Sequence, residues 1–433
     1  MSIQRKQTGV FYGWWVVIAG VVVYATLLGS HQTFGVFFKP IQTEFGWSRA
    51  VTAVAFFVGG LTQSALSPVT GILSDRYGPR IVITGLGIIA STGYFLASQV
   101  QSQWQLYSYF ILMASGMSFW VPIQAMVSRW FTKRRGLVLG LTGIGGGLGQ
   151  AVWPPLAQVL IDQFGWRSAY MIMAVILAVV VISAAQILKG TPKERGLVPY
   201  GEEDKDNDKD RDRDADTREN TRVALPAFKL RQALRTKAFW MILVGISTGS
   251  FTLQMTWIHL VPYVTDPGIG LTAVVGATLL STIGWSNVMG KVILGNLSDR
   301  IGSHATLGMC YGMAGLSMVW LIFAKDLWAL YLFAAVLGFF YGGWIPMQAA
   351  FVGSIFGLSS MGAILGALQM GTSIAGPTGA IVAGHIYDVT GSYYYAFIIG
   401  AVLFFTASTL VFLVRKPDNS SIAATSIQPN RDR

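Results

Sequence analysis

The sequence is poor in charged residues and almost free of cysteine. Only 12% of its 433 residues are charged, about half of the share in a typical soluble domain. Its one cysteine, Cys310, excludes an internal disulfide framework and a cysteine-based metal cluster. The apolar segments contain neither a nucleophile paired with a base nor a set of metal ligands. We therefore expect no enzyme activity, no metal ion and no cofactor.

The low share of charged residues is matched by a high share of apolar residues. Hydrophobic residues make up 53% of the chain, aromatic residues 13%, and its 50 glycines are more typical of membrane helices than of soluble ones. A helix that crosses a bilayer needs about 20 apolar residues. The sequence therefore predicts an all-α membrane protein with twelve transmembrane helices, at residues 11–31, 48–70, 80–98, 104–127, 137–161, 166–189, 238–262, 271–296, 304–324, 328–352, 361–386 and 393–414.

The positions of lysine and arginine predict the orientation. Basic residues collect in the cytoplasmic loops of membrane proteins. If both termini are cytoplasmic, the outer loops receive few basic residues, namely Lys39, Arg49, Arg167 and Lys325. The net charge of +11 arises largely at the inner ends of apolar segments, which is the pattern of membrane orientation. We expect a lipid bilayer as partner and no nucleic acid.

A charged segment divides the chain into two sets of six spans. Residues 202–219 interleave acids and bases, a composition that cannot bury a core and favours a solvated linker over a regulatory tail. Residues 225–238 have leucines and basic residues at helical spacing, which predicts an amphipathic helix on the cytoplasmic membrane surface. The predicted organisation is an N-terminal six-helix half (1–189), a linker (190–237), a C-terminal six-helix half (238–416) and a cytoplasmic tail (417–433).

The two halves repeat each other in sequence. The motif Gly-Ile-Leu-Ser-Asp-Arg-Tyr-Gly at 71–78 recurs as Gly-Asn-Leu-Ser-Asp-Arg-Ile-Gly at 295–302, an offset of 224 residues. Trp-Val-Pro-Ile-Gln at 120–124 recurs as Trp-Ile-Pro-Met-Gln at 344–348 with the same offset. Two separate motifs with one offset indicate a duplicated six-helix unit, which transporters arrange around a site near the membrane midplane.

The loop at 71–80 resembles the signature loop of the major facilitator superfamily. It matches every fixed position of the pattern G-x-L-a-D-r-x-G-x-r. The resemblance implies the major facilitator fold, with the substrate between two six-helix halves. It also implies a conformational latch between the halves on the cytoplasmic side, formed by Asp75, Arg76, Arg80, Asp299 and Arg300.

Looser motifs narrow the resemblance within that superfamily. They resemble prokaryotic monocarboxylate transporters and relatives of the oxalate–formate antiporter, and they lie at residues 35–39, 128–136, 230–240 and 259–266. The resemblance implies a small organic anion as substrate, with a proton as its co-substrate, in a prokaryotic inner membrane. We expect the protein to act as a monomer.

One charged residue lies inside a predicted span. Every acidic residue falls in a loop or at a span end, whereas Lys291 lies eight residues before Asp299, about 12 Å along the helix. A charge at that depth is costly and indicates a function. Lys291 would bind a carboxylate as a point charge, with Asn287 one turn earlier as a second donor. The structural alternative is a lysine that is paired with backbone carbonyls or that snorkels towards the inner surface, although snorkelling over about 12 Å exceeds the reach of one lysine. The family has arginine at this position, from which Lys291 departs.

Other candidates for the substrate site are polar and aromatic. Tryptophans and glutamines repeated in the two halves would close on the substrate from both sides. The alternative is that they are interface aromatics beside proline kinks. With a neighbouring tyrosine, these residues are Trp120, Gln124, Tyr341, Trp344 and Gln348. The family resemblance implies that His259 binds the substrate or the proton, with a packed histidine as the alternative. Span 361–386 offers Gln369 and no lysine, whereas oxalate–formate antiporters have a second cation there.

The predicted function is transport of a small monocarboxylate, such as lactate or pyruvate, together with a proton by alternating access. One fixed positive charge suits a monoanion better than a dianion. Because no acid lies inside a span, the proton would be carried by Lys291, by His259 or by the substrate. The alternatives are an organic-anion exchanger of the oxalate–formate type and a transporter of a neutral or aromatic solute stacked on Trp120 and Trp344.

Overall fold

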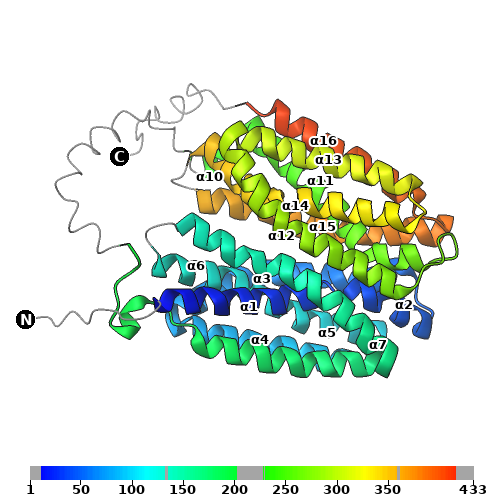
Figure 1. Ribbon diagram of the computed structural model, residues 1–433, viewed down its shortest axis with the longest axis horizontal. Helices are drawn as coiled ribbons and strands as arrows, with labels where there is room; N and C mark the ends of the chain where they lie inside the picture. Colours follow the sequence, from blue (N-terminus) through cyan, green and yellow to red (C-terminus); the bar gives the residue numbers. More distant parts are fainter. Residues whose placement is uncertain (1–10, 132–134, 202–227, 229, 358–360, 416–433) are drawn as a thin grey trace, which may run out of the picture.

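The computed structural model describes residues 11–131, 135–201, 228, 230–357 and 361–415 (Figure 1). The helices of the first half are α1 (Tyr12–His31), α2 (Phe34–Phe45), α3 (Arg49–Tyr77), α4 (Pro79–Ala97), α5 (Gln103–Ser115), η1 (Gly116–Phe119), α6 (Trp120–Trp130) and α7 (Arg135–Ile187), followed by η2 (Pro192–Arg195). Those of the second half are α10 (Leu230–Ala233), α11 (Lys237–Thr265), α12 (Ala273–Ile301), α13 (Ser303–Phe323), α14 (Leu327–Phe356), α15 (Met361–Thr390) and α16 (Tyr394–Leu413). The predicted all-α fold class is confirmed.

Ten stretches of the described chain are long and apolar enough to cross a membrane. One of them, Leu137–Ile187, contains Gly165 at φ 76° and ψ 159°, where the helix α7 is broken. This break lies between the predicted spans 137–161 and 166–189. The helix α15 covers the predicted span 361–386 without being among the ten. The chain is a multi-pass membrane protein, and the number of twelve spans stays a prediction.

The repeated signature loops have the same backbone geometry in the two halves. Gly78 ends α3 at φ 85° and ψ 151°, and Gly302 ends α12 at φ 87° and ψ 152°. Each glycine donates its backbone N–H to a serine four residues earlier, Ser74 or Ser298. A positive φ favours glycine, because it has no Cβ to clash with the backbone. The repeat found in the sequence is thus also a repeat in structure.

The chain differs from expectation after the first span and in the predicted amphipathic segment 225–238. After the first span the chain continues into a separate helix, α2, whose buried face includes Phe34, Phe37 and Phe38. In the segment 225–238, α10 has only four residues and α11 begins at Lys237. Thr236 separates them, because its extended backbone caps α11 and its hydroxyl accepts the N–H of Phe239 at 3.2 Å. Residues 225–227 and the charged segment 202–219 lie outside the described residues.

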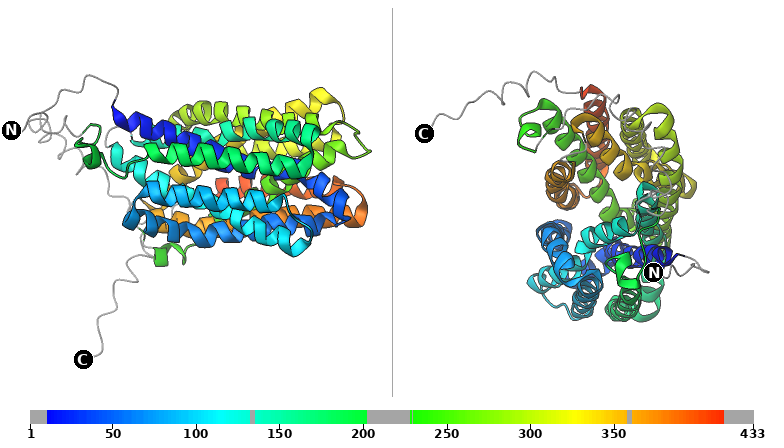
Figure 2. Two further views of the ribbon diagram at one scale, coloured as in Figure 1. Left: turned by 90° about the horizontal axis from the view of Figure 1, so that it is seen from below. Right: turned by 90° about the vertical axis from the view of Figure 1, so that its left-hand side faces the viewer.

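Each half has its own hydrophobic core. One cluster of buried side chains runs through α1–α7 and a second through α10–α16. Figures 1 and 2 show the two halves side by side, with the start of α1 and the end of α16 at the same end of the bundle and α2 at the other. We call the end that contains α2 the outer end, following the predicted orientation, and the opposite end the inner end.

Small residues bring the two halves into close contact. The contacts run between α7 and α12 and between α3 and α15. A Cβ on Gly284 would lie 2.4 Å from the backbone nitrogen of Ala151, and a Cβ on Gly60 would lie 2.7 Å from Cγ of Pro377. The hydroxyl of Ser281 donates to the carbonyl of Ala151 at 2.5 Å. Backbones packed this closely are typical of helices that associate inside a membrane.

Candidate functional site

Lys291 lies on α12 at the contact between the two halves. Its ammonium group donates to the carbonyl oxygen of Gly143 on α7, with an Nζ–O distance of 2.7 Å. The side chain is partly buried, and none of the ion pairs among the described residues includes it. The single intramembrane cation therefore has a neutral backbone acceptor from the opposite half and no carboxylate partner in the described chain.

Asn287 lies one turn before Lys291 and is buried, with 3% of its surface exposed. Its side chain packs over Gly147 of α7, where a Cβ would lie 2.9 Å from the amide oxygen of Asn287. The glycine-rich stretch 143–149 also packs against α1, since a Cβ on Gly149 would lie 2.1 Å from the carbonyl oxygen of Ala25. These glycines bring three helices together around the Lys291 site.

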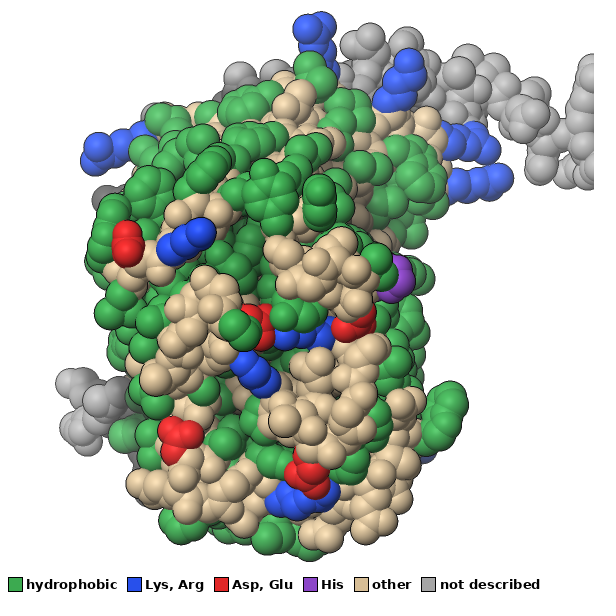
Figure 3. Space-filling view, turned by 90° about the vertical axis from the view of Figure 1, so that its right-hand side faces the viewer, with side chains coloured by type: hydrophobic (Ala, Val, Ile, Leu, Met, Phe, Trp, Pro, Cys, Tyr) green, Lys and Arg blue, Asp and Glu red, His purple; other side chains and the backbone are tan. Residues whose placement is uncertain are grey.

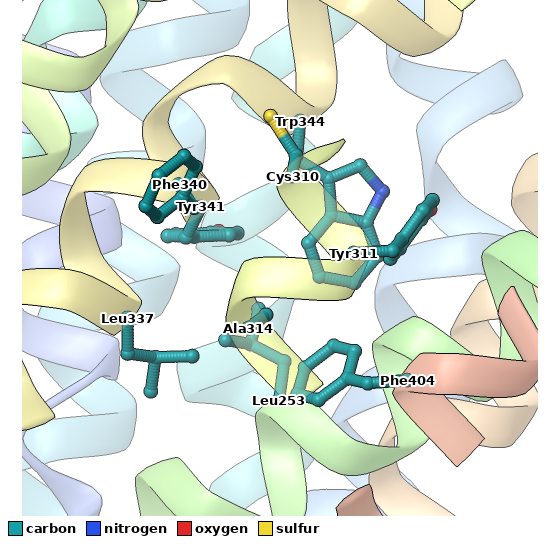
Figure 4. Close-up of a pocket in the computed structure, with 9 residues that line it drawn as sticks. All are labelled: Leu253, Cys310, Tyr311, Ala314, Leu337, Phe340, Tyr341, Trp344 and Phe404. Atoms are coloured by element: carbon teal, nitrogen blue, oxygen red, sulfur yellow. The ribbon is translucent and has the colours of Figure 1, made fainter. Parts of the chain in front are cut away.

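An aromatic cluster lies within the C-terminal half and includes Tyr311, Tyr341 and Trp344 (Figure 4). The ring of Tyr341 lies edge-on to Trp257, with centroids 5.4 Å apart, and to Trp344 at 5.8 Å. The amide of Gln348 donates to the hydroxyl of Tyr311 at 3.1 Å. Helices α12 and α14 meet closely here, because a Cβ on Gly342 would lie 2.2 Å from the carbonyl oxygen of Asn287. The backbone of α14 next to Tyr341 is thus close to that of Asn287, whereas Trp344 and Gln348 contact Tyr311 inside the C-terminal half.

The remaining predicted substrate ligands are distributed more widely. Trp120 packs edge-on against Tyr24 of α1 at 5.1 Å, and Gln124 lies one turn further along α6; both are partly buried. Gln369 is exposed on α15, and none of its described hydrogen bonds goes to Lys291 or Asn287. Within the described residues, no group of three or more histidine, cysteine or acidic side chains could hold a metal ion.

His259 is buried in a hydrogen-bonded position towards the outer end of α11. Its Nδ1 lies 2.8 Å from the hydroxyl of Tyr393, and its Nε2 lies 2.8 Å from the carbonyl oxygen of Ala380. Phe38 of α2 packs edge-on against the imidazole ring at 5.1 Å. Both ring nitrogens are therefore occupied by groups of the C-terminal half, and neither contacts Lys291.

Arg49, which the sequence placed in an outer loop, is the centre of a buried ionic cluster between the halves. Its guanidinium donates to Asp266 at 2.8 Å and to the hydroxyl of Tyr393, and it lies 3.4 Å from the ring centroid of Tyr387. The residue is 4% exposed. A buried arginine needs several acceptors, and here the C-terminal half supplies them.

Two further contacts of this cluster cross between the halves. The carboxylate of Asp388 accepts the backbone N–H groups of Arg49 and Ala50, each at 2.9 Å, and so caps the start of α3. Lys39 of α2 donates to the carbonyl oxygen of Thr265 at 2.8 Å and lies 3.5 Å from Asp266. We call Lys39, Arg49, Asp266, Asp388 and Tyr393 the outer lock. Figure 3 shows basic and acidic side chains gathered at the centre of this end.

The signature loop makes its described contacts within its own half. Asp75 forms an ion pair with Arg129 of α6 at 2.5 Å, and both side chains are largely exposed. Arg80 bonds to the side chain of Gln186 on α7, and Arg76 lies 5.3 Å from the ring centroid of Tyr77. In the second copy Arg300 is exposed, and the side chain of Asp299 is outside the described set. None of the described contacts of these residues joins the two halves.

The chain matches the family model of the Major Facilitator Superfamily over residues 20–293 and again over 268–430. It belongs to the major facilitator superfamily. Among curated proteins of the superfamily, it is 29% identical to "Monocarboxylate transporter 13" of Rattus norvegicus over 410 residues, covering 93% of this chain and 89% of the relative. It is 26% identical to "Monocarboxylate transporter 12" of Homo sapiens, covering 92% and 80%.

A bacterial relative and a solved structure extend the comparison. The chain is 24% identical to "Uncharacterized MFS-type transporter YhjX" of Escherichia coli (strain K12), over 83% of this chain and 85% of the relative. Its fold is similar to that of a bacterial homolog of the human lysosomal transporter Spinster in an inward-facing and occupied conformation. That similarity has a TM-score of 0.71 at 14% identity and covers 95% and 99% of the two chains. Together they support a membrane transporter of the major facilitator fold.

Proposed function

We propose that this major facilitator transporter carries a small monocarboxylate together with a proton. The observation that carries the proposal is Lys291, a cation between the two halves whose described partner is a carbonyl oxygen of the opposite half. A backbone carbonyl can hold an ammonium group while the site is empty, and a carboxylate is the stronger partner for it. The names of the curated relatives, monocarboxylate transporters 12 and 13, support the same class of substrate.

The surroundings of Lys291 support a small substrate. Asn287 offers an amide one turn away, and the close approach of Gly342 to Asn287 brings α14 against this part of α12. A single cation balances one carboxylate, whereas a dicarboxylate would leave one negative charge unpaired at low dielectric. We therefore favour a monoanion such as lactate or pyruvate over oxalate.

The Lys291 contact also suggests how binding is linked to alternating access. Lys291 is on the C-terminal half and Gly143 on the N-terminal half, so their bond joins the halves. An arriving carboxylate would replace Gly143 as the acceptor and release this bond. Trp120 and Gln124 on one half, with Trp344 and Gln348 on the other, would then close around the substrate.

Charge balance favours a proton as the co-substrate. Moving a monoanion inward against a cell-negative potential costs about 2.3 kcal/mol per 100 mV, and a co-moving proton cancels this cost. Lys291, His259 and the substrate are the candidate carriers, since the acidic residues lie in loops or at span ends. For Lys291, proton and anion would bind together as a neutral pair.

The proposed setting is a prokaryotic inner membrane with both chain termini in the cytoplasm and the protein acting as a monomer. The low number of basic residues in the outer loops supports this orientation. In that orientation the outer lock faces the external medium and the signature loops face the cytoplasm. The exposed Asp75 and Arg76 loop and its repeat would act as the latch when the inner end closes.

The test is uptake of radiolabelled carboxylates into proteoliposomes that contain the purified protein. We expect a monocarboxylate to be taken up, and Lys291→Gln to weaken its binding by about 10- to 150-fold, the loss of one charged hydrogen bond of about 1.5–3 kcal/mol. Lys291→Arg should keep part of the binding, since arginine retains the charge. Lys325→Gln, in an exposed outer loop, is the matched control and should bind normally.

Three outcomes would contradict parts of this proposal. Unchanged affinity in Lys291→Gln would remove Lys291 from the site. Uptake that ignores the pH gradient but requires a carboxylate inside the vesicle would make the protein an exchanger. Uptake of a neutral solute in preference to every carboxylate would overturn the substrate class.

A further inference from the structure

The hydrogen bonds around His259 form a chain whose direction is fixed by chemistry. An arginine can only donate, so the guanidinium of Arg49 donates to the hydroxyl oxygen of Tyr393. A carbonyl can only accept, so Nε2 of His259 carries a proton and donates it to Ala380. The hydroxyl hydrogen of Tyr393 is then free to bond to Nδ1 of His259. Each hydrogen bond in this chain, from Arg49 through Tyr393 and His259 to Ala380, then has one donor and one acceptor if His259 is neutral.

Protonation of His259 breaks that arrangement. With both ring nitrogens protonated, Nδ1 also donates to Tyr393, whose oxygen then accepts from two cationic donors. The hydroxyl hydrogen of Tyr393 loses its acceptor, and the residue is only 2% exposed. A buried polar hydrogen without a partner is unfavourable, so the closed cluster disfavours the charged histidine.

The charge balance of the cluster gives the same result. The groups that face His259 and its partners are Arg49 of α3, Lys39 of α2, Asp266 after α11, and Asp388 and Tyr387 of α15. With neutral His259 the two cations are balanced by two carboxylates. Protonated His259 adds a third positive charge on the C-terminal half, opposite Arg49 and Lys39 on the N-terminal half. A surplus charge buried at an interface weakens the interface.

We propose that His259 makes the outer lock sensitive to pH, so that its protonation from the external side separates the two halves at the outer end. This inference rests on the proposed function, in which the protein alternates its access and uses protons. It places the external proton on Nδ1 of His259, next to the hydroxyl of Tyr393. This proton site is separate from the substrate site at Lys291. The lock closes again once the proton has left Nδ1.

Linkage sets the sign of the expected effect. The closed lock holds neutral His259 and the open state accepts the proton, so acid favours opening. One linked proton changes the ratio of open to closed molecules by up to about tenfold per pH unit. Because the closed lock disfavours the charged histidine, opening is expected only at a pH below the ordinary histidine pKa of about 6.5.

The experiment measures the distance between two spin labels across the outer end, with no substrate present. Thr43→Cys on α2 and Val389→Cys on α15 provide exposed label sites, in a Cys310→Ala background that removes the native thiol. In lipid nanodiscs, a single short distance is expected at about pH 8, and a longer distance should gain population at about pH 5.5. His259→Gln and His259→Asn keep a neutral side chain and should abolish the pH response.

His304→Gln is the matched control. His304 lies in the same half and donates from Nε2 to the backbone carbonyl oxygen of Val411 at 2.6 Å, but it is outside the outer lock. This variant should respond to pH as the background does. A distance distribution that does not change with pH, or a pH response that persists in both His259 variants, would overturn the inference. Because the measurement needs no substrate, failure of carboxylate uptake would count against the proposed function alone.

Discussion

At the scale of single residues, Lys291 and Arg49 are two cations at the interface of the halves with different kinds of partner. Arg49 has carboxylate, hydroxyl and aromatic partners on the opposite half, which compensate its charge fully in the closed structure. Lys291 has a backbone carbonyl in the described chain. A compensated buried ion fixes an arrangement, whereas one held by a neutral acceptor remains available to an incoming anion.

Asp75 provides the residue-scale prediction for the signature loop. Asp75→Asn should change the transport rate and the inside/outside accessibility of introduced cysteines, with substrate affinity altered less than about twofold. The physical reason is that its ion pair with Arg129 is largely exposed near the inner end of α3, whereas Lys291 lies on α12 and contacts neither residue in the described chain. Since exposed ion pairs contribute about 0–1 kcal/mol, the variant should also remain folded.

Arg129→Gln is the partner control for that prediction. It removes the same ion pair from the other side and should change accessibility in the same direction. Rates and equilibrium binding are measured on the same proteoliposome preparations, with cysteine labelling from each side. A large loss of affinity in Asp75→Asn with unchanged labelling would place Asp75 in the substrate site and contradict the latch.

At the scale of helices, glycines determine how closely α12, α14 and α7 approach the Lys291 site. Gly342→Ala would place a Cβ 2.2 Å from the carbonyl oxygen of Asn287, so α12 and α14 must separate. Overpacking of this kind costs about 1–3 kcal/mol, and we expect a lower melting temperature in detergent together with weaker substrate binding. Gly366→Ala on α15 has nothing within 4 Å of its new Cβ and serves as the control. Equal melting temperatures for the two variants would contradict this account of the packing.

At the scale of the whole molecule, the proposed proton symport predicts electroneutral transport. If a proton accompanies each monoanion, no net charge crosses the membrane, so a potential of 100 mV should leave the uptake rate unchanged. Inward movement of an anion without a proton would instead cost about 2.3 kcal/mol against a cell-negative potential of 100 mV. The measurement compares uptake with and without a potassium–valinomycin potential at a fixed pH gradient. Uptake that follows the potential would require a different coupling stoichiometry.

The contacts that close the outer end of the bundle also concern the whole molecule, because they join its two halves. Hydrogen bonds and a close glycine contact join α3 to the C-terminal half at Arg49, Ala50 and Gly60. The halves are thus joined at the outer end and at the level of Lys291.

Local features of the sequence were sufficient for the fold and for the duplicated unit. Long apolar segments must be helices in a bilayer, because their backbone groups have no other hydrogen-bond partners there. The equal offset of the two motifs predicted a repeat, and Gly78 and Gly302 share one backbone geometry because each ends its helix at the same turn. Lys291 could be singled out for the same reason, since a lone cation in an apolar segment is costly wherever its neighbours lie.

Only the tertiary structure decided which groups Arg49 and His259 contact. In the sequence, Arg49 follows a polar turn and looks like the exposed start of a helix. It is buried only because α15, Asp266 after α11 and Tyr393 before α16 pack around it. His259 is likewise held by groups 121 and 134 residues away in sequence. Hydrophobicity and helical period are properties of neighbouring residues and can be read along the chain. An ionic cluster between two halves depends on side chains brought together by packing, so no local pattern encodes it.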